Sequence, residues 1–157
     1  RPIEFQALAN GYVIIKTDVR GTGASFGHRN SPLPPAEVQD TYDILDWIIA
    51  QPWSNGNVGA YGISYTGMTA GMAATVGHPA LKAVVLGWSA IYDEYKSAMQ
   101  PFGFVQPGVV CQWSDLLVAL WSNDYKMAGR GIMPVDGDEN AYLLKQAIKE
   151  HQQNETV

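Results

Sequence analysis

The chain has 157 residues, a length that suits one compact domain with a buried core. Hydrophobic residues make up 46% of the chain, and no apolar run approaches the ~18 residues of a membrane-spanning helix. The net charge is −5 and the ten Lys and Arg residues are not clustered, which argues against nucleic acid as a partner. We expect a soluble protein that acts on a small molecule or a peptide. Its oligomeric state and compartment stay open, with the cytoplasm slightly preferred.

The first third of the chain is predicted to hold one strand and one long loop. The chain begins at Arg1 and shows no signal core, so we expect an excerpt of a longer protein. Residues 11–18 are rich in β-branched side chains and precede a Gly-rich stretch at 20–23, a pattern that predicts a buried strand ending in a loop. Three prolines between residues 28 and 35 exclude regular structure there.

Helical spacing of the apolar residues between 38 and 49 predicts a helix that ends before Pro52. Carboxylates in its early turns suit the positive end of the helix dipole. We expect these acids to be capping and solvated surface charge: Glu37, Asp40 and Asp43.

Two further short strands flank a helix rich in Ala and Met. Residues 57–61 and 81–87 are predicted as strands, and residues 68–76 as the helix between them. A strand, a helix and a strand of these lengths favour a right-handed crossover and a parallel sheet covered by helices. The sequence therefore indicates an α/β fold.

The strand and helix rhythm breaks after Trp88. The rest of the chain is rich in Tyr, Trp and Pro, and an amphipathic helix is predicted from residue 139 to about 151, with no fourth strand. We interpret residues 1–88 as the sheet segment and residues 89–157 as a helical insertion. The single cysteine, Cys111, has no partner for a disulfide or a thiolate metal site and is expected to be a buried apolar side chain. No metal or cofactor motif appears.

Residues 59–67 carry the chemistry, because a predicted strand runs through a serine with glycine neighbours directly into a helix. A sharp strand-to-helix turn lifts a serine hydroxyl clear of the sheet, where a base and a substrate can both reach it. Gly62 and Gly67 provide the small neighbours that such a turn needs. Ser64 is therefore the candidate nucleophile, and the Tyr65 backbone N–H, at the helix N-terminus, can donate to an oxyanion. The usual pattern has glycine where Thr66 stands.

Four motifs in order resemble one family. They are DVRGTGAS at 18–25, YDILDW at 42–47, QPWSNGNVG at 51–59 and GISYTG at 62–67. Together they are similar to the Xaa-Pro dipeptidyl-peptidase and cocaine-esterase-like serine hydrolases of the α/β-hydrolase superfamily. The similarity is close over residues 18–67 and looser to about residue 88, and it includes the elbow variant with Thr66.

The resemblance implies a partial α/β-hydrolase, a parallel sheet with flanking helices, followed by an α-helical cap insertion. Ser64 maps to the nucleophile and Tyr65 to the residue that contributes its backbone amide to the oxyanion hole. Residues 89–157 would be a truncated cap. The family's second oxyanion donor, a tyrosine hydroxyl, is expected before Arg1, and the triad acid and histidine beyond Val157.

The histidines and later acids of the chain are not expected to complete a triad. His28 precedes the serine, His78 ends the nucleophile helix, and His151 belongs to a terminal helix, so all three are expected to be surface residues. The remaining acids are expected to be loop and helix-cap carboxylates: Asp93, Asp115, Asp124, Asp136 and Asp138.

Two other groups of residues have a structural and a functional interpretation. Asp18 and Arg20 favour an ion pair or a loop brace over substrate contact. Six aromatic residues either line an acyl pocket or pack the cap on the sheet, and the sequence does not decide between these: Trp88, Tyr92, Tyr95, Phe102, Trp113 and Trp121.

The leading hypothesis is a serine hydrolase without metal or cofactor that cleaves an ester or amide bond through an acyl-enzyme. The alternative is a chain that keeps the fold as a non-catalytic binding module, or an inactive fragment. Turnover of an activated ester by this chain alone distinguishes them, and we expect little or none, because the base is missing.

Overall fold

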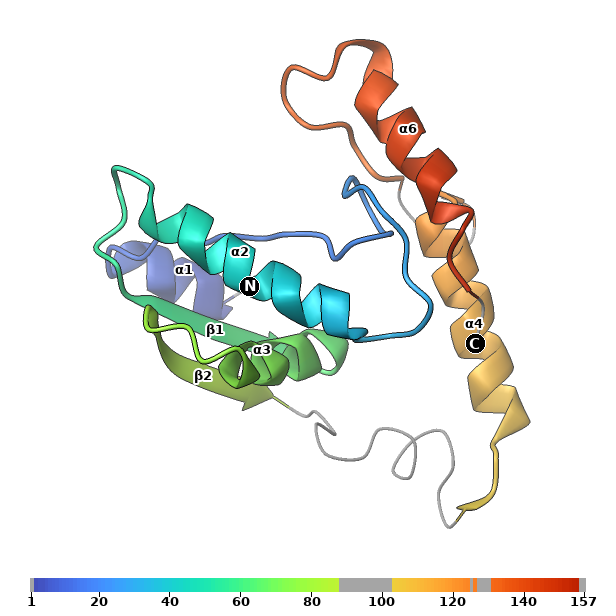
Figure 1. Cartoon of the computed structure of the whole chain (residues 1–157), viewed down its shortest axis with the longest axis horizontal. Helices are drawn as coiled ribbons and strands as arrows, with labels where there is room; N and C mark the ends of the chain where they lie inside the picture. The colour runs from blue at the N-terminus through green and yellow to red at the C-terminus, as the bar shows by residue number, and fades with distance from the viewer. Residues whose placement is uncertain (1, 88–102, 125, 127–130, 156–157) are drawn as a thin grey trace.

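The computed structural model describes residues 2–87, 103–124, 126 and 131–155 (Figure 1). Its elements in chain order are α1 (Pro2–Ala9), α2 (Pro35–Ile49), β1 (Val58–Ile63), α3 (Tyr65–Thr75), β2 (Leu81–Gly87), α4 (Pro107–Trp121), the 3-10 helix η3 (Glu139–Ala141) and α6 (Tyr142–His151). None of the helices in these ranges is long and apolar enough to cross a bilayer.

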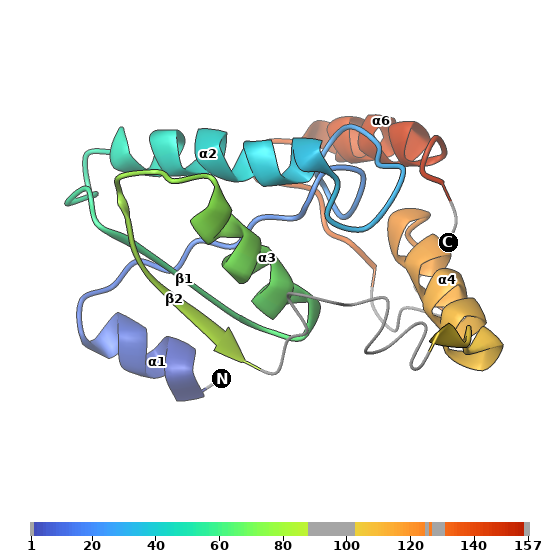
Figure 2. The same cartoon turned by 60° about the horizontal axis from the view of Figure 1, so that its bottom comes forward.

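The centre of the fold is a β-α-β unit. β1 and β2 pair in parallel, in a register that runs from Val58 opposite Leu81 to Ile63 opposite Gly87. α3 packs on both strands and α2 packs against α3 (Figure 2). The predicted helix before Pro52, both later strands and their parallel pairing are confirmed.

Small residues allow α3 to lie close to the sheet. Its buried positions include Gly67, Gly71, Ala70 and Ala73, which add little bulk between the helix axis and the strands. The opposite face of the sheet is open by comparison, since apolar side chains on it are 38–63% exposed: Tyr61, Ile63 and Val85. The two faces therefore differ, and α3 begins on the covered one.

The strand predicted at residues 11–18 is wrong. Residues 12–19 have no regular structure, and among the described residues the sheet consists of β1 and β2 alone. The segment is largely exposed, with Tyr12 at 68% and Val13 at 55%. β-branched residues form a strand only where their backbone pairs with a neighbouring strand, and residues 12–19 pair with neither β1 nor β2.

The first helix was not expected, although the sequence carries signals for it. Pro2 stands at the first helical position and Glu4 in the first turn, both of which favour a helix start. The Glu4 carboxylate accepts a hydrogen bond of 3.2 Å from the Tyr61 hydroxyl and lies 3.0 Å from Lys16 Nζ. α1 is thus tied to the face of the sheet that α3 leaves open.

The described part of the C-terminal region contains the helices α4 (Pro107–Trp121) and α6 (Tyr142–His151). α4 and α6 lie apart from the sheet, and the chain before α2 reaches toward α6 (Figure 1). η3 and α6 together match the amphipathic helix expected at 139–151, and α6 buries Leu144, Ala147 and His151 along one side. A boundary at residue 88 and the role of residues 89–157 as a cap stay predictions, since residues 88–102 lie outside the described ranges.

Cys111 was expected to be buried, and that prediction is wrong, because its side chain is exposed on α4. α4 buries Leu117, Ala119 and Trp121 near its C-terminal end, whereas Cys111 belongs to its second turn. A residue of α4 is therefore buried when its part of the helix contacts neighbouring segments, whether or not the residue is apolar.

Candidate active site

Ser64 forms the turn between β1 and α3 and is exposed. Its N–H donates to the Gly87 carbonyl of β2 at 3.0 Å, while its own carbonyl accepts the Met68 N–H of α3 at 3.0 Å. The residue has φ 59° and ψ −128°, a conformation that an L-residue rarely adopts. A serine hydroxyl is therefore presented at a strained strand-to-helix turn, which is the geometry of a nucleophile elbow.

The glycine at position 62 is required by close packing across this turn. A Cβ atom on Gly62 would overlap the carbonyl of Thr66 and lie 2.6 Å from the backbone nitrogen of Gly67. The first turn of α3 therefore folds directly over the backbone of β1. This agrees with the need for small neighbours inferred from the sequence.

The turn accommodates Thr66 at the position usually held by glycine. The Thr66 hydroxyl accepts a hydrogen bond from the Ile63 N–H and donates to the Ile63 carbonyl, both at 2.9 Å. The Thr66 side chain is exposed. It lies outside the tight contact that Gly62 makes, and it closes the turn with two extra hydrogen bonds.

Tyr65 is the first residue of α3, and the N–H groups of a first helical turn lack partners within the helix. Such a group beside Ser64 can donate to an oxygen that becomes negative during attack. The structure places the Tyr65 backbone where the sequence expects an oxyanion donor, next to the candidate nucleophile. Its action on a substrate stays a prediction.

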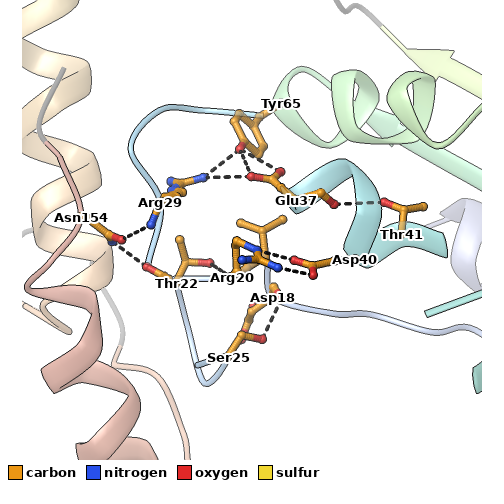
Figure 3. A network of polar contacts seen from close by, with 12 residues as sticks. Asp18, Arg20, Thr22, Ser25, Arg29, Glu37, Asp40, Thr41, Tyr65 and Asn154 are labelled. Carbon is orange, nitrogen blue, oxygen red and sulfur yellow. Dashed lines mark hydrogen bonds and ion pairs between the residues drawn. The ribbon is translucent and has the colours of Figure 1, made fainter. Parts of the chain in front are cut away.

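The Tyr65 side chain joins a polar cluster that the sequence did not reveal (Figure 3). Its hydroxyl accepts a hydrogen bond from Arg29 Nη1 at 2.8 Å and donates to the two carboxylate oxygens of Glu37 at 3.2 and 3.4 Å. Arg29 Nη1 also lies 3.7 Å from Glu37 Oε2, and the two charged side chains are only 4% and 5% exposed. We call Arg29, Glu37 and Tyr65 the tyrosine clamp.

Burial raises the pKa of two groups in the clamp. It raises the pKa of the Tyr65 phenol to about 12, and the neighbouring Glu37 charge adds to the rise. Burial also raises the pKa of the Glu37 carboxyl, against which the Arg29 guanidinium acts. The phenol therefore stays protonated at neutral pH, so it can donate to Glu37 while it accepts from Arg29.

Two predictions about the acids of α2 are corrected. Glu37 is buried in the tyrosine clamp, and Asp40 binds Arg20, with Arg20 Nε 2.6 Å from Asp40 Oδ2 (Figure 3). Neither is free surface charge, because the loop before α2 folds back and brings its arginines to the helix. Asp18 accepts the Ala24 N–H at 3.0 Å, which confirms its role as a loop brace.

None of the three histidines bonds to Ser64. His28 is exposed, as expected. His78 and His151 are instead 5% and 0% exposed, which corrects their assignment to the surface. Each of their ring nitrogens has a polar partner, so burial leaves none of them without a hydrogen bond.

The contacts of the two buried histidines are structural. His78 Nε2 lies 3.0 Å from Asp46 Oδ1, and its Nδ1 accepts the Ala80 N–H at 3.1 Å. His151 places its Nδ1 2.9 Å from the Trp121 carbonyl and its Nε2 2.7 Å from the Ser25 carbonyl. Neither ring is available to Ser64 as a base.

The other acids and aromatic residues give a mixed result. Asp138 accepts the Leu143 and Leu144 N–H groups and Asp124 accepts the Lys126 N–H, which confirms both as cap or loop carboxylates. Trp121 is buried and Trp113 half-buried. The remaining aromatic candidates and one acid lie outside the described residues: Trp88, Tyr92, Tyr95, Phe102 and Asp93.

A parallel β-α-β unit with a strained serine at its strand-to-helix turn defines a chain of the α/β-hydrolase type. The chain belongs to the X-Pro dipeptidyl-peptidase (S15) family, whose family model matches residues 3–155. This agrees with the resemblance carried by the four motifs.

Relatives in the family carry two kinds of name. The chain is 34% identical over 158 residues to a candidate serine esterase of Mycobacterium bovis, covering 96% of this chain and 25% of the relative. It is 34% identical over 112 residues to a cocaine esterase of a Rhodococcus species, covering 70% of this chain and 19% of that protein. A Xaa-Pro dipeptidyl-peptidase of Lactobacillus helveticus is 29% identical over 132 residues, which cover 73% of this chain and 16% of the peptidase. The chain thus spans a quarter or less of the length of these relatives.

Proposed function

We propose that this chain contributes the nucleophile of a serine hydrolase that cleaves an ester or amide bond through an acyl-enzyme. The observation that carries the proposal is the exposed, strained position of Ser64 between β1 and α3. Membership of the S15 family supports it, and so do relatives named as esterases and as a dipeptidyl-peptidase. A small ester, an amide or a peptide is the proposed substrate class.

The chemistry follows from the position of the hydroxyl. Ser64 Oγ forms a bond to the carbonyl carbon of the substrate while a base removes the hydroxyl proton. The carbonyl oxygen becomes negative and accepts the Tyr65 backbone N–H, a kind of contact that typically stabilises the transition state by ~3–4 kcal/mol. Collapse of this intermediate releases the alcohol or amine with the proton, and water then hydrolyses the acyl-enzyme.

The base and its orienting acid are proposed to come from sequence that this chain does not contain. In the described part of the chain no histidine or carboxylate bonds to the Ser64 hydroxyl, and two of the histidines are engaged elsewhere. The order serine, acid, histidine of α/β-hydrolases places both after the nucleophile. We propose residues 89–157 as part of a cap, and a second oxyanion donor in sequence before Arg1.

Replacing the nucleophile tests the proposal. In the longest natural form of the protein, we expect Ser64→Ala to lower hydrolysis of an activated ester and of an Xaa-Pro anilide by at least about a thousandfold, because only binding and the oxyanion donor remain. Ser31→Ala, at an exposed loop serine, is the matched control and keeps the wild-type rate. Hydrolysis that survives Ser64→Ala contradicts the proposal, and a wild-type protein without hydrolysis favours the non-catalytic binding module.

A further inference from the structure

We propose that Arg29 and Glu37 are positioning residues for the proposed hydrolysis, because they hold the Tyr65 side chain and thereby fix the direction of the Tyr65 backbone N–H. This inference rests on the proposed function of Ser64. It assigns a role to the tyrosine clamp, which brings together the loop before α2, the first turn of α2 and the first residue of α3 (Figure 3).

The residue types in the tyrosine clamp are better explained by a role in positioning Tyr65 than by a contribution to the stability of the fold. Both charged groups are almost fully buried. Removing two charges from water is costly, and apolar residues of similar volume often stabilise a fold as well as a buried ion pair does. A charged pair that also binds a third group directionally is better suited to setting a position than to adding stability.

Hydrogen bonds hold the Tyr65 phenol from two sides. Arg29 donates to the phenol oxygen, and the phenol donates its proton to the two carboxylate oxygens of Glu37. The link between the phenol oxygen and the Cα of tyrosine is a rigid ring with two rotatable bonds. Holding the oxygen therefore restrains the Cα of Tyr65 and the amide attached to it.

Restraint is needed at this place because the neighbouring backbone is strained. The conformation of Ser64, with φ 59°, persists only if its surroundings prevent relaxation. Gly62 and Thr66 restrain the turn from the β1 side. The clamp restrains Tyr65, the first residue of α3, from the side of α2. Gly62 and Thr66 make no contact on that side of Tyr65 through the interactions described above.

The main chain of Arg29 is itself fixed by the C-terminal residues. Its N–H donates to Asn154 Oδ1 at 2.9 Å, and its carbonyl accepts the Glu155 N–H at 3.1 Å. The guanidinium therefore extends from an anchored backbone to the Tyr65 hydroxyl. This anchoring explains how a loop residue can act as a rigid support.

Three variants of the longest natural form test the inference. Tyr65→Phe removes only the hydroxyl, Glu37→Ala removes the acceptor, and Glu37→Gln restores an acceptor oxygen without the charge. Tyr142→Phe, at a tyrosine that is 64% exposed, is the control. The measurements are kcat and KM for an activated ester, with active sites counted by a fluorophosphonate burst, and the inhibition constant of a boronic acid that forms a tetrahedral adduct with serine.

We expect Tyr65→Phe and Glu37→Ala to lower kcat per labelled site by about 10- to 100-fold, with KM within about twofold, because misplacement of a catalytic group by about 1 Å is that costly. The boronic acid should bind more weakly by a similar factor, and Glu37→Gln should recover part of the loss. If Tyr65→Phe fails to fold, the comparison of Glu37→Ala with Glu37→Gln decides.

Unchanged kcat per labelled site in the clamp variants overturns the inference. The inference is also overturned if the variants lose activity only because fewer molecules are labelled, since a purely structural role predicts that result. The proposed function fails in a different way, since a wild-type protein without a labelled, active Ser64 removes the reaction itself.

Discussion

Ser64 is held in its conformation by its neighbours and not by its own preference. A backbone with φ 59° and ψ −128° costs roughly 1–3 kcal/mol for a residue other than glycine. The hydrogen bonds to Gly87 and Met68 keep it in place, and the absence of a side chain at Gly62 lets α3 begin over β1. The elbow is thus a property of residues 62–68 together.

The first residue-scale prediction concerns Gly62. We expect Gly62→Ala to destabilise the longest natural form by roughly 1–3 kcal/mol or more, because the new Cβ has no space beside the first turn of α3. Gly59→Ala is the matched control on the same strand, since a Cβ there lies 3.7 Å from the Ala83 carbonyl, an ordinary contact. Denaturant unfolding compares the two, and equal stability of both variants would show that the turn is not tightly packed.

The sequence predicts Ser64, Tyr65 and Gly62 because their requirements are local, within a few residues of one turn. Arg29 and Glu37 escape such reasoning, since their contacts with Tyr65 join residues 36 and 28 positions away. A buried acid in the first turn of a helix has the same sequence pattern as a solvated one. The burial of His151 depends in the same way on a loop that precedes it by 126 residues.

At the scale of elements, the β-α-β unit was predictable because its strands and helix are short, regular and joined by clear turns. The strand expected at residues 11–18 is absent and the helix α1 was not predicted, so residue types and spacing alone do not determine every element. Residue types indicate which segments tolerate a strand, whereas strand formation also requires pairing with another part of the fold.

The C-terminal segment and the loop before α2 form a second element-scale feature. Asn154 accepts the Arg29 N–H and donates to the Gly21 carbonyl at 2.8 Å, and Glu150 accepts the Gly27 N–H at 2.7 Å. Together with His151, these contacts tie the end of α6 to the loop at residues 21–29 (Figure 1). The loop that carries Arg29 is therefore shaped by residues far away in the sequence.

We expect Asn154→Ala to speed hydrogen exchange of amides in residues 21–29, that of Arg29 above all, because two partly buried hydrogen bonds are lost. The accompanying loss of stability should be roughly 1–3 kcal/mol. Gln153→Ala, at the exposed neighbouring position, is the control and should leave exchange unchanged. Equal exchange in both variants would mean that α6 does not order the loop.

At the scale of the whole molecule, the chain holds one part of a family architecture. It spans a quarter or less of the length of its relatives, and it contains a serine elbow without a histidine or carboxylate bonded to it in the described ranges. A parallel sheet is usually covered on both faces, whereas here α3 covers one face and apolar side chains are exposed on the other. The chain therefore supplies the turn on which the proposed reaction depends, and the groups that activate it are proposed to lie elsewhere.

The most direct test of this account is the site of covalent labelling by a fluorophosphonate in the longest natural form of the protein. We expect a single adduct, which peptide mapping by mass spectrometry locates on Ser64, formed together with complete loss of ester hydrolysis. An adduct on any other residue, or full hydrolysis by a protein that carries the adduct on Ser64, would contradict the assignment of Ser64 as the nucleophile.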